Sequence, residues 1–147
     1  MQINFFQKNI LFEWNQEEAI RHWMVSTIQK EKPDLSIGEI SVIFCSDDYL
    51  LDINRRYLDH DYYTDIITFP FEENPLSGEL YISIDRIKEN ASDLGIDFKL
   101  ELARVIIHGV LHLCGYSDGT DDEQSKMRSL EDFYLAALPD LGDAKYK

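Results

Sequence analysis

The apolar residues of this chain repeat at two different spacings, and the spacing changes several times along the sequence. Short β-branched and aromatic runs at 2–7, 39–46, 65–71 and 78–84 favour β-strands, and residues 10–14 also look extended. Longer stretches carry apolar residues three or four positions apart, which is typical of amphipathic helices. The pattern predicts the order βαβαββααα.

Five helices are predicted, because residues that favour helix ends stand beside each helical stretch. Asn15 is expected to open the first helix with Glu18 as its capping-box partner, and Thr120 with Glu123 to open the last. Glycine and proline are expected to close several of these helices, since neither continues one easily. The remaining residues expected to begin or end a helix are Pro33, Ser46, Asp85, Gly95, Asp97, Gly115 and Pro139.

These elements predict an α+β fold, in which a small mixed β-sheet of about four strands is packed with helices. Pro70 lies near the end of its strand and has no amide hydrogen to donate, so we expect either that the strand lies at an edge of the sheet or that Pro70 is its last residue. A chain of 147 residues can bury about two-thirds of its surface around one core. We therefore expect a single domain over residues 1–147.

The composition fits a folded protein of the cytoplasm. Apolar residues make up 44% of the chain and aromatic residues 12%, which argues against disorder. No apolar run approaches the roughly 18 residues that a membrane span needs, and the first residues lack the features of a signal peptide. Cys45 and Cys114 are too few for a disulfide framework. We expect a reduced, cytoplasmic protein with no membrane partner.

The net charge of −14, from 28 acidic and 14 basic residues, restricts how this chain can bind nucleic acid. A protein of this charge repels polyanions at long range. Binding to RNA would therefore have to depend on a local basic patch or on a metal ion.

His108 and His112 stand four residues apart inside the apolar run of the fourth helix. Residues at this spacing share one face of a helix, so both imidazoles can reach one metal ion. Two core histidines bonded to carbonyls or acids are the alternative. Gly115 lets the chain turn back, and Asp118 follows six residues after His112, so the pattern H-x3-H-x5-D favours a metal site at the C-terminal end of a buried central helix. Zinc proteases place a glutamate directly after the first histidine as general base, and Gly109 stands there instead.

The segment H-G-V-L-H-L-C-G-Y-S-D at residues 108–118 resembles the signature H-G-x-L-H-L-x-G-Y-D-H of the YbeY family of bacterial metal-dependent endoribonucleases. Three further stretches are similar to family motifs, and the resemblance is strong over about residues 46–118. They are Ile53-Asn54 with Tyr57, Thr64 to Pro70, and Gly78 to Ser83.

The sequence departs from this family at functional positions. The family's third histidine falls on Asp118 and the preceding aspartate on Ser117, and a carboxylate remains an accepted zinc ligand. The family's arginine beside the metal falls on Leu58. Arg55 or Arg56 is a candidate replacement, although an offset of two or three residues faces another side of a helix.

The resemblance implies a zinc-dependent endoribonuclease specific for single strands, acting in maturation of the 16S rRNA 3′ end and in ribosome quality control. It implies one Zn²⁺ per chain held by His108, His112 and Asp118, with other divalent metals as alternatives. Ribosomal RNA, ribosomal proteins of the small subunit and a ribosome-assembly GTPase are the implied partners. Two other functions stay open: a non-catalytic ribosome assembly factor with a structural metal, and a metal-dependent hydrolase of another substrate.

Overall fold

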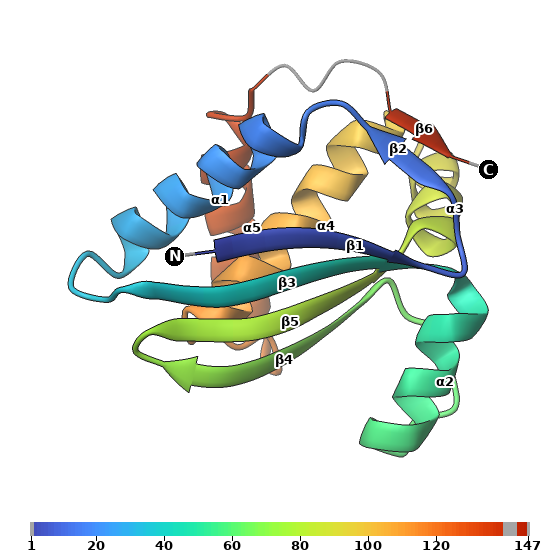
Figure 1. Ribbon diagram of the computed structural model, residues 1–147, viewed down its shortest axis with the longest axis horizontal. Coiled ribbons are helices and arrows are strands. Elements are labelled where there is room, and N and C mark those ends of the chain that lie inside the picture. Colours follow the sequence, from blue (N-terminus) through green and yellow to red (C-terminus); the bar gives the residue numbers. More distant parts are fainter. Residues whose placement is uncertain (1, 140–143, 147) are drawn as a thin grey trace.

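The computed structural model describes residues 2–139 and 144–146 (Figure 1). Helices and strands begin and end close to the positions that the apolar spacing predicts. In chain order the elements are β1 (Gln2–Lys8), β2 (Phe12–Trp14), α1 (Glu17–Glu31), β3 (Ile37–Cys45), α2 (Asp47–Leu58), β4 (Ile66–Glu73), β5 (Leu76–Ser83), α3 (Ile84–Leu94), α4 (Phe98–Leu113), α5 (Asp121–Leu135) and β6 (Ala144–Tyr146).

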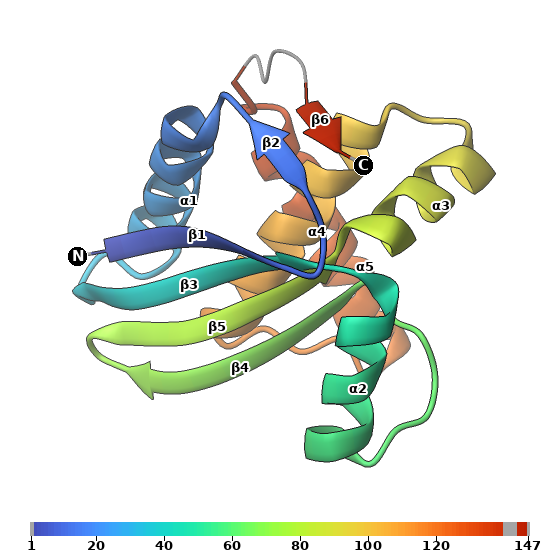
Figure 2. The same ribbon diagram turned by 45° about the vertical axis from the view of Figure 1, so that its right-hand side comes forward.

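The main sheet has four strands in the order β1-β3-β5-β4. β1, β3 and β5 run parallel, and β4 pairs antiparallel with β5, so the sheet is mixed. β4 lies at an edge and continues beyond Pro70 to Glu73, so the edge position is confirmed and an end of the strand at Pro70 is not. The ladder shifts register directly after that proline. The predicted α+β class with about four mixed strands is confirmed. β2 and β6 form a separate antiparallel pair beside the start of α4, where Phe12 packs against Phe98 (Figure 2).

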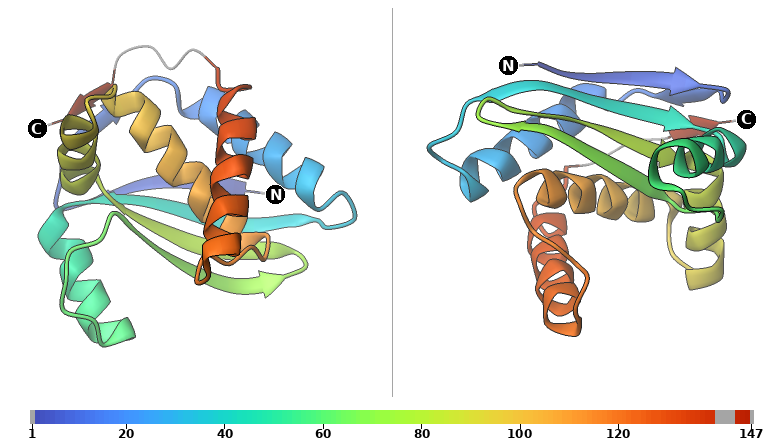
Figure 3. Two further views of the ribbon diagram at one scale, coloured as in Figure 1. Left: turned by 180° about the vertical axis from the view of Figure 1, so that it is seen from behind. Right: turned by 90° about the horizontal axis from the view of Figure 1, so that it is seen from below.

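Helix α4 lies across one face of the sheet beside α1, and α5 packs against α4 on the side away from the sheet and also contacts α1 (Figure 3). Nearly all of its apolar residues are buried in the main core. Gly109 faces the sheet, where a Cβ atom would lie 2.7 Å from Ile66 Cδ1 and 3.0 Å from Leu80 Cδ2. A glutamate at this position would therefore point into the core and not toward the two histidines.

Helix α2 packs near the end of the opposite sheet face and covers a second, smaller core of Cys45, Leu50, Ile53 and Ile67. Ile66, the preceding residue of β4, packs against the main core instead. Successive side chains of a strand point to opposite faces, so β4 contributes to both cores. This position brings the end of α2, the loop after it and the start of β4 close to the C-terminal half of α4.

The start of the first helix is the clearest difference from the sequence-based expectation. The sequence predicts Asn15 as its cap, but α1 begins at Glu17 with Gln16 as N-cap, and the Gln16 side chain makes no capping hydrogen bond. Thr120 and Glu123 do form the expected capping box of α5, and Gly95 and Gly115 adopt positive φ angles at the ends of their helices. Among the described residues, no helix is long and apolar enough to cross a membrane.

Candidate metal centre

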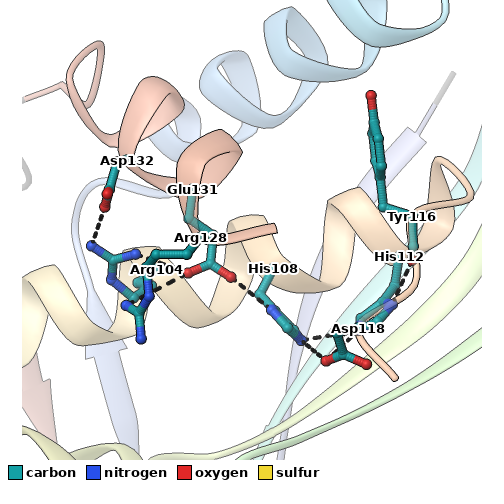
Figure 4. A network of polar contacts seen from close by, with 8 residues as sticks. All are labelled: Arg104, His108, His112, Tyr116, Asp118, Arg128, Glu131 and Asp132. Atoms are coloured by element: carbon teal, nitrogen blue, oxygen red, sulfur yellow. Dashed lines mark hydrogen bonds and ion pairs between the residues drawn. The ribbon is translucent and has the colours of Figure 1, made fainter. Parts of the chain in front are cut away.

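Three ligand atoms converge at the C-terminal end of α4 (Figure 4). The Nε2 atoms of His108 and His112 lie 2.9 Å apart, and Asp118 Oδ2 lies 3.3 Å from the first and 3.4 Å from the second. Two ligands of a tetrahedral zinc ion at 2.0–2.1 Å are separated by about 3.3–3.4 Å. The two nitrogen–oxygen separations match that value, and the nitrogen pair needs to open only slightly.

The turn after α4 carries Asp118 back to the histidines. Gly115 adopts a φ of +104°, a backbone conformation that residues other than glycine rarely adopt. The Tyr116 amide then donates to the Leu111 carbonyl, which closes the helix. Local geometry of the helix end therefore produces the H-x3-H-x5-D convergence that the sequence predicts.

The opposite nitrogen of each imidazole is held by an acceptor. His112 Nδ1 lies 2.8 Å from the Tyr116 carbonyl, and His108 Nδ1 lies 2.8 Å from Glu131 Oε2. Both contacts require a hydrogen on Nδ1, which leaves the lone pair of a neutral imidazole on Nε2. Two such lone pairs and a carboxylate oxygen then face one another across about 3 Å. These three electron-rich atoms repel one another unless a cation lies between them, so the residues fit a metal ion.

Glu131 belongs to the site, although the sequence analysis missed it. It lies on α5, is 5% exposed, and also receives a hydrogen bond from Arg104 Nη1 at 2.8 Å. Arg104 in turn donates to Asp132 (Figure 4). Met127, Glu131 and Tyr134 form the buried stripe of α5. The sequence does carry one signal for Glu131: it is an acidic residue at a core-facing position of a helix, and buried acidic residues usually have a partner.

The charged groups around His108 shift one another's pKa values. Burial would raise the pKa of Glu131, but hydrogen bonds from His108 and Arg104 outweigh burial and lower it. Burial would likewise lower the pKa of His108, yet the hydrogen bond and charge of Glu131, with the charges of Asp118 and Asp65, raise it. The pKa of Asp65 is raised, chiefly by burial. The acidic groups around the imidazoles thus favour a positive charge where the two rings meet.

A pocket of about 570 Å³ opens onto the three ligands. Leu58, at the family's arginine position, lines this pocket, but Arg55 and Arg56 do not. Arg55 pairs with Asp61 of the following loop and Arg56 pairs with Asp52 of α2, and all four side chains are exposed. Three parts of the chain also line the pocket: α2 and the following loop with Asn54, His60, Tyr62, Thr64 and Asp65, the strand β4 with Ile66 to Thr68 and Pro70, and the end of α4 with His108, His112 and Gly115 to Asp118.

Cys114 lies in the main core and away from the ligand atoms, as its place on the helix predicts. Burial raises its thiol pKa to about 11, so the thiolate form is scarce. Within the described part of the chain, His108, His112 and Asp118 form the group of histidine, cysteine and acidic residues arranged to hold an ion.

A mixed sheet, a central helix with two histidines, and a carboxylate from the following turn define an α+β protein with a group of residues that could hold a metal ion beside an open pocket. The family model for Endoribonuclease YbeY matches residues 2–139. The chain belongs to this family, and membership supports an endoribonuclease role.

Individual relatives agree with this assignment. The Endoribonuclease YbeY of Cytophaga hutchinsonii is 48% identical over 136 residues, covering 91% of this chain and 94% of that protein. The Flavobacterium psychrophilum protein of the same name is 48% identical over 128 residues, covering 86% and 90%. The solution structure of TM1509 from Thermotoga maritima is similar with a TM-score of 0.66 and 26% identity, covering 93% of this chain and 89% of that one.

Proposed function

We propose that this protein is a metal-dependent endoribonuclease that cuts single-stranded RNA at the pocket beside α4. The observation that carries the proposal is the convergence of His108, His112 and Asp118, whose Nε2 and Oδ2 atoms lie 2.9–3.4 Å apart at the pocket wall. The names of its relatives supply the RNA substrate.

His108, His112 and Asp118 would hold the metal, which would supply a Lewis acid for a phosphate oxygen and for the attacking oxygen. The Glu131 carboxylate and the Tyr116 carbonyl keep both imidazoles in the tautomer that presents Nε2. The position after His108 offers no base, because Gly109 faces the sheet. This absence disfavours the chemistry of helical zinc proteases and hence a peptide substrate.

Zinc is the proposed metal, because two imidazoles, one carboxylate and one open position are a common catalytic zinc arrangement. Maturation of the 16S rRNA 3′ end, ribosome quality control, a cytoplasmic location, and contacts with small-subunit proteins and an assembly GTPase remain proposals that rest on the family resemblance.

The test is cleavage of matched single-stranded and double-stranded RNA by tag-free, zinc-loaded protein, with and without a chelator. We expect about one zinc per chain and cleavage of the single strand, which stops with the chelator and resumes after zinc is returned. His108→Ala and His112→Ala should lose both metal and cleavage, because each leaves two ligands. Full zinc occupancy without cleavage of any RNA would favour the assembly factor instead.

A further inference from the structure

The pocket beside the metal centre is built without the cations that usually hold RNA. Among the described residues that line it, two are acidic, Asp65 and Asp118, and none is lysine or arginine. The family's arginine position is occupied by Leu58. A phosphate in this pocket would therefore find no lysine or arginine among these residues to pair with.

The space on the other side of His108 offers no better hold for a phosphate backbone. A second pocket of about 590 Å³ contains Arg104 and Arg128, and both guanidinium groups face Glu131, at 2.8 Å and 3.9 Å. Acidic residues outnumber these two arginines in its lining, namely Asp65, Glu101, Asp118, Asp121 and Glu131. Neither side of the metal centre therefore attracts a polyanion strongly.

The first pocket does offer an aromatic ring. Tyr62 lines it with 56% of its surface exposed. The ring lies nearly parallel to that of His60, with centroids 5.1 Å apart and an angle of 21° between the planes. The Tyr62 hydroxyl also contacts His60 Nδ1 at 2.9 Å. One face of Tyr62 is thus supported by another ring.

The loop that carries Tyr62 is fixed by a buried residue of α2. The Asn54 side-chain amide, in a residue only 1% exposed, donates to the Tyr62 carbonyl at 2.9 Å. The Asn54 carbonyl accepts from the His60 amide at 3.1 Å, just after Asp59 turns the chain with a φ of +55°. Asn54 therefore holds the backbone that carries the ring, and this support does not depend on the Tyr62 side chain.

The neighbouring aromatic side chains are engaged elsewhere. The Tyr63 hydroxyl donates to Asp48, and the Tyr63 ring lies under the Arg86 guanidinium. The Tyr116 hydroxyl donates to Glu31 at 2.6 Å, and its ring points away from the metal centre (Figure 4). Tyr62 is thus the aromatic ring best placed to receive a ligand next to the three metal ligands.

We propose that this pocket binds an unpaired nucleobase of the RNA, stacked on Tyr62, and that stacking substitutes for the phosphate contacts that the cleft lacks. The inference rests on the proposed function and adds how the substrate is held. Every base has an aromatic face, so such a subsite accepts any sequence but requires a base free of its duplex partner. This requirement lets the protein select single-stranded RNA although its pocket has no basic groove.

The test is the affinity of zinc-loaded protein for a fluorescent, single-stranded 2′-O-methyl RNA oligonucleotide, measured by anisotropy, with the oligonucleotide checked for cleavage afterwards. Tyr62→Ala should raise Kd by about 5- to 150-fold, the range that loss of one base–aromatic stack implies. Tyr62→Phe and Tyr62→Trp should stay within about threefold of wild type, because both keep a ring. Zinc content should be the same in all variants.

Two further measurements separate stacking from other effects. Loss of a phosphate contact would lower the slope of log affinity against log salt by about 0.7, whereas Tyr62→Ala should leave the slope unchanged. An oligonucleotide of abasic residues should bind weakly and equally to wild type and Tyr62→Ala. Tyr63→Ala is the matched control, since it removes a ring of 48% exposure from the same loop.

Equal affinities for wild type and Tyr62→Ala, or equal losses for Tyr62→Ala and Tyr63→Ala, would overturn the proposal. A weaker salt slope in Tyr62→Ala would also overturn it, because the contact would then be to phosphate. Failure of the proposed function looks different: zinc-loaded wild type would neither bind nor cut any RNA. If wild type cuts RNA but Tyr62→Ala binds normally, only the stacking subsite is refuted.

Discussion

Glu131→Gln tests whether the carboxylate behind His108 controls metal binding. Glu131 accepts hydrogen bonds from both His108 Nδ1 and Arg104 Nη1, each at 2.8 Å. Glutamine offers one acceptor oxygen and one donor NH₂ in nearly the same shape. If the glutamine NH₂ faces Arg104, two hydrogen-bond donors oppose each other. If it faces His108, the imidazole must carry its hydrogen on Nε2, and that atom then has no lone pair for a metal.

The expected magnitude follows from this change. Loss of a carboxylate behind a metal-ligating histidine typically weakens metal binding by 10- to 100-fold, or about 1.4–2.8 kcal/mol. The metal-free protein should also lose about 1–3 kcal/mol of stability, because Glu131 is 5% exposed and a buried group is left mispaired. The zinc affinity is the more specific readout, since destabilisation alone would accompany many core substitutions.

The assay is competition for Zn²⁺ between the tag-free protein and a chromophoric chelator, after urea unfolding has shown that each metal-free variant is folded. Asp132→Asn is the matched control, because the Asp132 side chain is 59% exposed and accepts a hydrogen bond from the same Arg104, not from a histidine of the metal site. Its stability should change by less than about 1 kcal/mol and its zinc affinity should stay at the wild-type value. Equal zinc affinity in wild type and Glu131→Gln would refute the reasoning, and equal losses in both variants would assign the effect to Arg104.

Three further variants test other parts of the structure. In the same competition assay, Asp118→His should bind zinc as tightly as wild type or more tightly, since imidazole is the softer donor. Asp118→Ala should bind zinc clearly more weakly, because it removes a ligand. Equal zinc affinity in all three proteins would show that Asp118 is no ligand. Replacing Arg55 and Arg56 together by alanine should change RNA cleavage by less than about twofold, because both lie in exposed ion pairs outside the pocket, and a large loss would restore them as substitutes for the arginine absent at Leu58. Gly78→Ala should lower the free energy of unfolding in urea by about 1–3 kcal/mol, because its Cβ would lie 2.6 Å from the Phe69 carbonyl oxygen; Gly119→Ala, with its nearest atom at 3.7 Å, is the control.

Local spacing in the sequence determined most of the elements and the centre of the site. The helical period places His108 and His112 on one face, and a glycine at a helix end favours the turn that returns Asp118 to them. Pro70 likewise marked its strand as an edge strand, because a missing amide hydrogen has the same consequence in any sheet. Such features depend on residues a few positions apart, whose geometry the backbone fixes by itself.

Only the tertiary structure decided which distant residues meet these groups. Glu131 reaches His108 across 23 positions because α5 packs against α4, and no spacing rule connects the two helices. The same holds for the pocket wall, where the buried Asn54 fixes Tyr62 near the metal ligands while Arg55 and Arg56 point to exposed acids. Neighbours in sequence diverge here because a helix turns its side chains by about 100° per residue, so packing of a single face decides which of them enter the site.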